Sequence, residues 1–274
     1  MKLSHTSKSE FDSIKLLQIT DTHLFAPDNG SLLSINTQDS FHAVVDAVLK
    51  QDFDYEAILA TGDISQDHTP ESYQKFEEGI KPLKKPCYWL PGNHDYKPSM
   101  SSVLPSPQIQ CVEHVILGEH WQMIMLDSQV VGVPHGRLSD QQLSLLADKL
   151  EENPNLHTLV LLHHHPILVG SAWLDQHTLK DSEQFWDVVG QHSNVRGILC
   201  GHVHQDMNRL HMGAQVMATP STCVQFKPNS DDFALDTLSP GWRELELNAD
   251  GTIDTQVKRL VNGCFSPDFN AEGY

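Results

Sequence analysis

Cysteine is scarce in this 274-residue chain, and its distribution excludes a disulfide framework. The five cysteines are an odd number and form no Cys-x-x-Cys pair. Several lie within or beside apolar runs, which is typical of reduced, buried thiols. The cysteines therefore indicate a protein of the reducing cytoplasm.

Positive charge is also in short supply. Lys and Arg number 18 against 36 Asp and Glu, so the formal net charge is −18 at pH 7. A surface this acidic disfavours nucleic acid or an anionic membrane as a partner. It also repels phosphate esters unless the protein supplies local positive charge, and bound metal ions are one such source.

Long apolar runs are missing as well. No run approaches the ~20 residues that a transmembrane helix requires. Residues 1–10 lack the apolar core of a signal peptide. We therefore expect neither a membrane span nor secretion.

Apolar runs that predict strands alternate with segments whose apolar residues have helical spacing, which indicates an α/β fold. Residues 1–13 are predicted to be a mobile polar lead-in, 240–274 a β-hairpin and tail, and 1–274 a single domain. We predict helices capped by Asn36 or Thr37, by Thr69-Pro70 and by the Ser139/Gln142 capping-box pattern, and a further helix over 182–189. The predicted strands are 14–20, 57–61, 87–90, 112–117, 121–126, 159–162, 195–200, 216–219, 243–247 and 252–260, and 97–110 is predicted to be an irregular loop.

Histidine is abundant, with 17 residues, and much of it follows predicted strands. Because the carboxyl ends of strands form the binding edge of an open α/β sheet, such residues should converge. Each fragment alone is also compatible with an ordinary turn or polar surface, but their joint occurrence favours one site. The strand-end residues are Asp21 and His23; Asp63; Asn93 and His94; His163, His164 and His165; and His202 and His204.

Imidazole, carboxylate and amide oxygen suit Fe, Mn, Zn, Ni or Co. About seven ligands are too many for one tetrahedral ion, so we expect two ions that share one carboxylate. A pair of metals ~3.5–4 Å apart can clamp an in-line displacement at phosphorus. The same ions would give this acidic chain a local positive site for a phosphate ester.

The order Asp-x-His, Gly-Asp, Gly-Asn-His-Asp, His-x-Pro and Gly-His-x-His, over residues 14–220, resembles that of the calcineurin-like metallophosphoesterases. The resemblance implies a four-layered α/β/β/α sandwich with two metal ions, Fe, Mn or Zn, at the C-terminal edge of the strands. It implies that one ion is held by Asp21, His23, Asp63 and His204. The other is then held by Asp63, Asn93, His202 and one residue of the histidine run.

Within the run, the family ligand usually stands two residues before a proline, which favours His164; His163 at the strand end is the alternative, and His165 would support its neighbours. His94 is implied to stand over the phosphate, which His23, Asp63, Asn93 and His204 would also contact. Asp95 is expected either to orient the His94 ring or to form a loop hydrogen bond.

The chain is most similar to the bacterial class III 3′,5′-cyclic-AMP phosphodiesterases at residues 18–25, 89–95, 218–228, 240–243 and 272–274. This implies hydrolysis of the small molecule 3′,5′-cyclic AMP to 5′-AMP by a hydroxide that bridges two metals, with His94 assisting the leaving oxygen. The alternatives are another phosphate ester as substrate and a non-catalytic scaffold. Phe25, His135 and residues 219–226 are candidates for the pocket walls.

Overall fold

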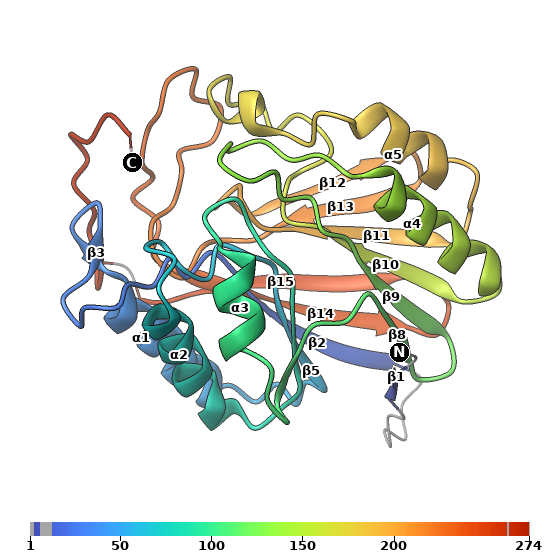
Figure 1. The fold of residues 1–274 in the computed structure, drawn as a ribbon, viewed down its shortest axis with the longest axis horizontal. Coiled ribbons are helices and arrows are strands. Elements are labelled where there is room, and N and C mark those ends of the chain that lie inside the picture. The colour runs from blue at the N-terminus through green and yellow to red at the C-terminus, as the bar shows by residue number, and fades with distance from the viewer. Residues whose placement is uncertain (1–2, 6–12, 262, 274) are drawn as a thin grey trace.

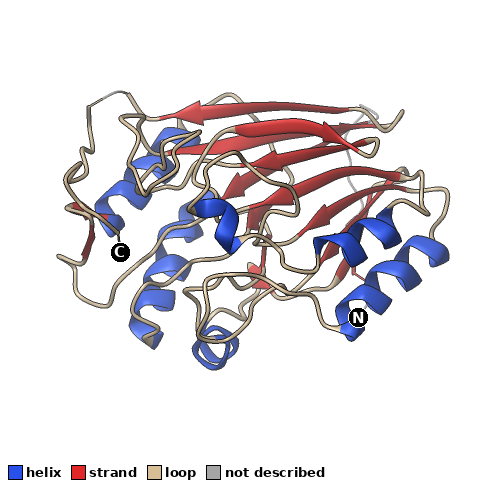
Figure 2. Ribbon diagram, turned by 90° about the horizontal axis from the view of Figure 1, so that it is seen from above, coloured by secondary structure: helices blue, strands red, loops and turns tan. Residues whose placement is uncertain are grey.

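Two β-sheets face each other, and helices cover their outer surfaces (Figures 1 and 2). The computed structural model describes residues 3–5, 13–261 and 263–273. One sheet has the strand order β1-β8-β9-β10-β11-β13-β12 and the other the order β15-β14-β2-β5-β6-β7. The mixed α/β class predicted from the sequence is confirmed.

The strands of the first sheet pair in parallel except for β8 with β9 and β12 with β13. They are β1 (Leu3–His5), β8 (His114–Leu117), β9 (Trp121–Met125), β10 (His157–Leu161), β11 (Val195–Cys200), β13 (Ala214–Ala218) and β12 (Met207–His211). The second sheet is parallel from β2 to β7, and β14 pairs antiparallel with β15 and β2. It contains β15 (Ile253–Arg259), β14 (Gly241–Asn248), β2 (Ser13–Ile19), β5 (Ala57–Ala60), β6 (Cys87–Trp89) and β7 (Ile109–Gln110), while β3 (Ser31–Leu32) and β4 (Ile35–Asn36) form a separate hairpin.

The helices lie on the two outer faces, with α1 and α2 on one side and α4 and α5 on the other (Figure 1). Three begin at the predicted caps: the side chains of Asn36, Thr69 and Ser139 accept from the backbone N–H three residues later. The helices are α1 (Thr37–Leu49), α2 (Pro70–Ile80), α3 (Lys97–Val103), α4 (Asp140–Glu152) and α5 (Ser182–Val189), with 3₁₀ turns at Lys81–Leu83 and Leu174–His177. Among the described helices, none has the length and apolar character to cross a membrane.

Alternating strand side chains fill three hydrophobic clusters. Leu16 of β2 and Leu159 of β10 lie in the cluster between the two sheets. Their neighbour Leu17 points to the cluster beneath α1 and α2, and Val160 points to the cluster beneath α4 and α5. These are the contacts that the predicted helix–sheet–sheet–helix layering requires.

Two expectations about local structure are wrong. Residues 97–110 contain α3 and β7 rather than only irregular loop. Pro98 fits the first turn of α3, and the fully buried Met100 packs into the cluster beneath α1 and α2, so tertiary packing stabilises a helix whose sequence reads as a loop. The predicted lead-in also contains a strand, since Leu3–His5 pairs with β8. The prediction that the lead-in is mobile otherwise falls on residues 1–2 and 6–12, which lie outside the described residues.

Candidate metal centre

The strand-end residues named from the sequence come together at one edge of the two sheets. Asp21 and His23 follow β2, Asp63 follows β5, and Asn93 and His94 follow β6 of the second sheet. The first sheet contributes His163, His164 and His165 after β10, and His202 and His204 after β11. Four overlapping groups of these side chains have potential ligand atoms within 4.8 Å of one another.

One group is formed by Asp21, His23 and His204. The Nε2 atom of His204 lies 3.3 Å from Asp21 Oδ1 and 3.2 Å from His23 Nε2. The Nδ1–H groups of both rings donate away from this point, His204 to Val224 O at 2.9 Å and His23 to Gln66 Oε1 at 2.7 Å. Each ring therefore presents an Nε2 lone pair to the shared space, as a metal-ligating histidine does.

A second group is centred on Asp63. His163 Nε2 lies 3.2 Å from Asp63 Oδ2 and 3.1 Å from Asn93 Oδ1, while its Nδ1–H donates to Thr61 O at 2.7 Å. Asp63 Oδ2 is also 3.9 Å from His23 Nε2 of the first group. Asp63 thus adjoins both groups.

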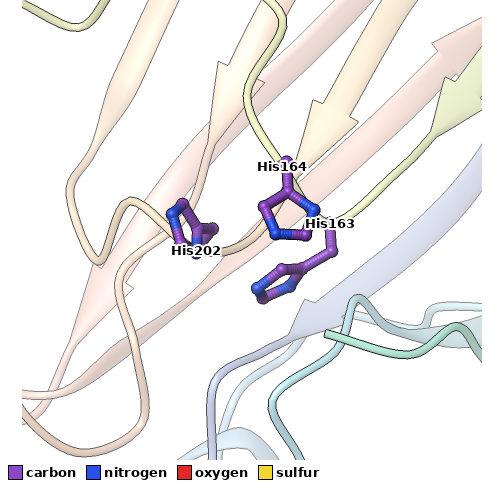
Figure 3. A group of neighbouring side chains, drawn as sticks. All are labelled: His163, His164 and His202. Carbon is purple, nitrogen blue, oxygen red and sulfur yellow. The ribbon is translucent and has the colours of Figure 1, made fainter. Parts of the chain in front are cut away.

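The histidine run presents each ring differently. His163 and His164 lie next to His202, and Figure 3 shows the three rings gathered from two loops. His164 Nδ1 shares a 2.8 Å hydrogen bond with Ser128 Oγ, and its ring centroid is 4.9 Å from that of His202. His165 stacks on His202 at 5.6 Å, with its Nε2 3.7 Å from Asp175 Oδ1. Of the three, His163 contacts both Asp63 and Asn93.

The backbone at this edge is strained at the candidate ligands. Asp21, His23, Asp63, His202 and His204 have φ of +55°, +47°, +50°, +64° and +52°. A non-glycine residue in the left-handed region costs on the order of 1 kcal/mol or more, and such residues concentrate at functional sites. The sequence contained no signal for this feature.

Two glycines allow the close packing that holds these carboxylates. A Cβ at Gly92 would lie 2.2 Å from Asp63 Oδ1, and one at Gly201 would lie 2.8 Å from Asp21 Oδ2. In their place, backbone N–H groups reach the carboxylates: His94 N donates to Asp63 Oδ1 at 2.8 Å, and His202 N donates to Asp21 Oδ1 at 3.0 Å. The Gly-Asn-His and Gly-His spacings therefore have a structural reason.

Burial sets the charge of most of the imidazoles. It lowers the pKa of His23 to about 3 and holds the pKa of His164 and His202 well below the usual value, so these rings are neutral and have a lone pair available. For His163, burial acts in the same direction, but the Asp63 carboxylate outweighs it and raises the pKa to about 9. Despite burial, His163 holds the pKa of Asp63 well below its usual value. Without an ion, His163 and Asp63 are therefore an ion pair.

His94 and Asp95 have different surroundings. The His94 ring meets the His23 ring edge-on at 5.1 Å and faces a pocket. The Asp95 carboxylate accepts from Ile64 N at 3.1 Å, Ser65 N at 3.1 Å, Gly92 N at 2.9 Å and Tyr73 OH at 3.1 Å. These bonds support the loop-tying role for Asp95 over the alternative of orienting His94.

Sequence reasoning missed two residues that hold the loops of the site. Gln129 Nε2 donates to Gly92 O and to Asp95 O, both at 2.6 Å. Thr20 Oγ1 donates to Asp21 Oδ2 at 2.6 Å. Gln129 lies in an irregular segment with no pattern to mark it, whereas Thr20 stands directly before a predicted ligand.

A pocket of about 510 Å³ opens beside the donor cluster. Asn93, His94 and His202 form part of its wall, and Trp173, Phe226 and Phe233 form another part. The Phe226 ring also stacks on His204 at 4.2 Å, with 7° between the planes. Of the wall candidates from the sequence, Phe226 lines the pocket, while Phe25 and His135 are not among its described lining residues.

The donor set fits metal ions. Buried polar atoms are ordinarily paired, yet among the described residues none offers a hydrogen bond to Nε2 of His164 or of His202. Imidazole nitrogens, carboxylates and the Asn93 amide are ligands for Fe, Mn or Zn. A cation would satisfy the unpaired nitrogen of His202 and balance two carboxylates that are at most 1% exposed, those of Asp21 and Asp63.

Comparison with known proteins gives a consistent result. Residues 14–206 match the family model described as calcineurin-like phosphoesterase. The chain is 66% identical over 274 residues to the 3′,5′-cyclic adenosine monophosphate phosphodiesterase CpdA of Vibrio vulnificus, covering 99% of this chain and 100% of that protein. It is 49% identical over 261 residues to the CpdA of Escherichia coli (strain K12), covering 95% of each. Among solved structures, a dimetal phosphatase from Danio rerio shares the fold, with a TM-score of 0.62 and 13% identity over 90% of this chain and 98% of that one.

Proposed function

Because the chain belongs to the calcineurin-like phosphoesterase family, we propose that it hydrolyses 3′,5′-cyclic AMP to 5′-AMP with the help of two metal ions. The proposal is supported by relatives named as cyclic-AMP phosphodiesterases that match almost the whole chain at 49–66% identity. The observation that carries it is the pair of donor groups that meet at Asp63 beside an open pocket.

The geometry supports a division of the ligands between two ions. Asp21, His23, His204 and Asp63 would hold one, and Asp63, Asn93, His163 and His202 the other. His163 is assigned here, although the sequence favoured His164, because its Nε2 is within 3.2 Å of oxygens of both Asp63 and Asn93. His164 borders the same space and would support this set through His202.

When bound, two ions would neutralise phosphate charge and lower the pKa of a coordinated water. We infer that residues of the chain itself would position the phosphate, and that His23, Asp63, Asn93, His94 and His204 would contact it. A water oxygen would form the new bond to phosphorus as the P–O3′ bond breaks, and the O3′ atom would take up a proton, whose donation we assign to His94. Asp95 and Gln129 would hold the loop that carries His94.

We also propose that the protein acts in the cytoplasm. All five cysteines are free thiols, and Cys87, Cys200 and Cys223 are buried without disulfide partners. Such cysteines are typical of a reducing compartment.

The test is an assay in which the purified protein is incubated with cyclic AMP, with and without a chelator. Formation of the product 5′-AMP is measured by chromatography. We expect turnover that the chelator removes and that added Mn²⁺ or Fe²⁺ restores. Cyclic GMP and bis(p-nitrophenyl) phosphate, tested in parallel, separate a cyclic-AMP phosphodiesterase from an enzyme for other phosphate esters. A metal-loaded protein without turnover on any of them would favour a scaffold and contradict the proposal.

A further inference from the structure

The pocket beside the donor cluster has two chemically different walls. The polar wall contains Asn93, His94 and His202. The aromatic wall is built around Trp173, whose ring centroid lies 5.0 Å from that of Phe226 and 5.1 Å from that of Phe233, both edge-on. A phosphate belongs at the first wall, and a flat nucleobase fits the second, because aromatic rings bind the faces of bases.

The C-terminal tail closes one side of this pocket. The tail, residues 263–273, is held near the β3–β4 hairpin, where Asp268 N donates to Leu33 O at 2.9 Å and Ala271 N donates back to Asp268 O at 3.1 Å. Glu272 and Gly273 then reach the pocket. Among its described lining residues, Glu272 is the only acidic one.

Glu272 is exposed in this pocket, so a bound molecule can form a hydrogen bond with its carboxylate only through a donor group. An ionised carboxylate only accepts hydrogen bonds, and the phosphate is repelled by it and offers acceptors alone. In a cyclic nucleotide, the donors belong to the nucleoside: the exocyclic amine of the base and the ribose 2′-hydroxyl. Glu272 therefore matches the nucleoside of the substrate and not its phosphate.

We propose that Glu272 is a specificity-determining residue that accepts a hydrogen bond from the nucleoside of the bound cyclic nucleotide, whose base packs against Trp173. This inference rests on the proposed function and deepens it. The donor cluster that would hold the metals selects phosphate esters in general, whereas Glu272 selects those that carry a nucleoside.

The experiment compares kcat/KM for cyclic AMP with kcat/KM for bis(p-nitrophenyl) phosphate, which has no nucleoside. We expect Glu272→Ala to lower the ratio of the two values about tenfold, the size of effect typical of a hydrogen bond to a charged group. Glu272→Gln keeps an acceptor oxygen and should recover part of the ratio. Glu119→Ala, which changes an exposed glutamate in the turn between β8 and β9, is the matched control and should leave the ratio unchanged.

Two analogues identify the donor. Purine riboside 3′,5′-cyclic monophosphate lacks the amine, and 2′-deoxy cyclic AMP lacks the hydroxyl. The inference is supported if the wild-type protein discriminates against one of them and Glu272→Ala abolishes that discrimination. An unchanged ratio in Glu272→Ala, with wild-type turnover of cyclic AMP intact, would overturn this inference alone. Absence of wild-type turnover would overturn the proposed function itself.

Discussion

The protein buries polar side chains in two regions that differ in how completely the chain satisfies them. Arg243 of β14 is 1% exposed and donates to Thr219 Oγ1, Thr255 Oγ1, Asp206 Oδ1 and Ala218 O at 2.8–3.0 Å. Because Ala218 belongs to β13 of the other sheet, this network joins the two sheets with protein atoms alone.

The histidine cluster is built differently. Nε2 of His202 and of His164 has no hydrogen-bond partner in the described part of the chain, and five of the candidate ligands have left-handed backbones. A buried polar group left unpaired costs on the order of 1–3 kcal/mol. The comparison teaches that burial alone does not mark a functional site; incomplete satisfaction combined with backbone strain does. Four experiments test this difference between the Arg243 network and the histidine cluster, and they follow in order of decreasing expected effect.

Asp63→Asn should have the largest effect. Asp63 adjoins both donor groups, so loss of its charge should weaken binding of both ions and lower turnover about 10³-fold, equivalent to about 4 kcal/mol of activation free energy. Metal content by mass spectrometry and kcat measure this. Asp181→Asn is the matched control, since Asp181 is also buried but its side chain accepts a hydrogen bond only from Leu138 N among the described hydrogen bonds. Retention of both ions by Asp63→Asn would contradict the role of Asp63 in binding them.

Asn93→Ala and His94→Ala should separate metal binding from proton transfer. His94→Ala should cut turnover about 10²-fold while metal content stays at the wild-type level, because a positioned acid contributes about that much. Asn93→Ala should lower both quantities, since its Oδ1 lies 3.1 Å from His163 Nε2 in the donor group. Equal metal loss in the two variants would refute the division of roles.

His163→Ala and His164→Ala should show which histidine of the run is the metal ligand. Removal of His163 should cost one ion, whereas removal of His164 should weaken metal affinity about tenfold, as loss of a supporting residue does. Metal titration of the apo-protein distinguishes them, with His120→Ala, an exposed histidine, as the control. If His164→Ala loses the ion and His163→Ala keeps it, the sequence-based preference is the better one.

Arg243→Met should have the smallest effect on chemistry and a clear effect on stability. It leaves Ala218 O and Thr219 Oγ1 without their donor, so we expect the free energy of unfolding to fall by about 2 kcal/mol. Urea denaturation measures this, and metal content should not change. Arg209→Met, at an exposed position on the edge strand β12, removes hydrogen bonds to Leu168 O and Val169 O and should cost about 1 kcal/mol or less. A metal loss in Arg243→Met as large as in Asp63→Asn would show that the two regions are not independent.

Much of the fold followed from local pattern. Helix α5 and strand β11 have the predicted bounds, and β14 and β15 form the β-hairpin predicted within 240–274. The pattern did not predict strand β12, whose residues after Met207 are exposed, because an edge strand of this kind has no apolar alternation to detect. Helix α3 was missed for the complementary reason: it lacks a side-chain cap and is stabilised by the burial of Met100.

By itself, the sequence determined which groups stand at the ends of the strands, and since parallel strands end at one edge, it also determined that these groups would meet. Only the tertiary structure decided which ring nitrogen each histidine presents, that Asp63 adjoins both donor groups, and that the tail places Glu272 in the pocket. The difference lies in how far apart in the chain the interacting residues are. Strand and helix periodicity is set by near neighbours, whereas ring orientation is set by partners such as Thr61 for His163, which lies 102 positions away in the chain.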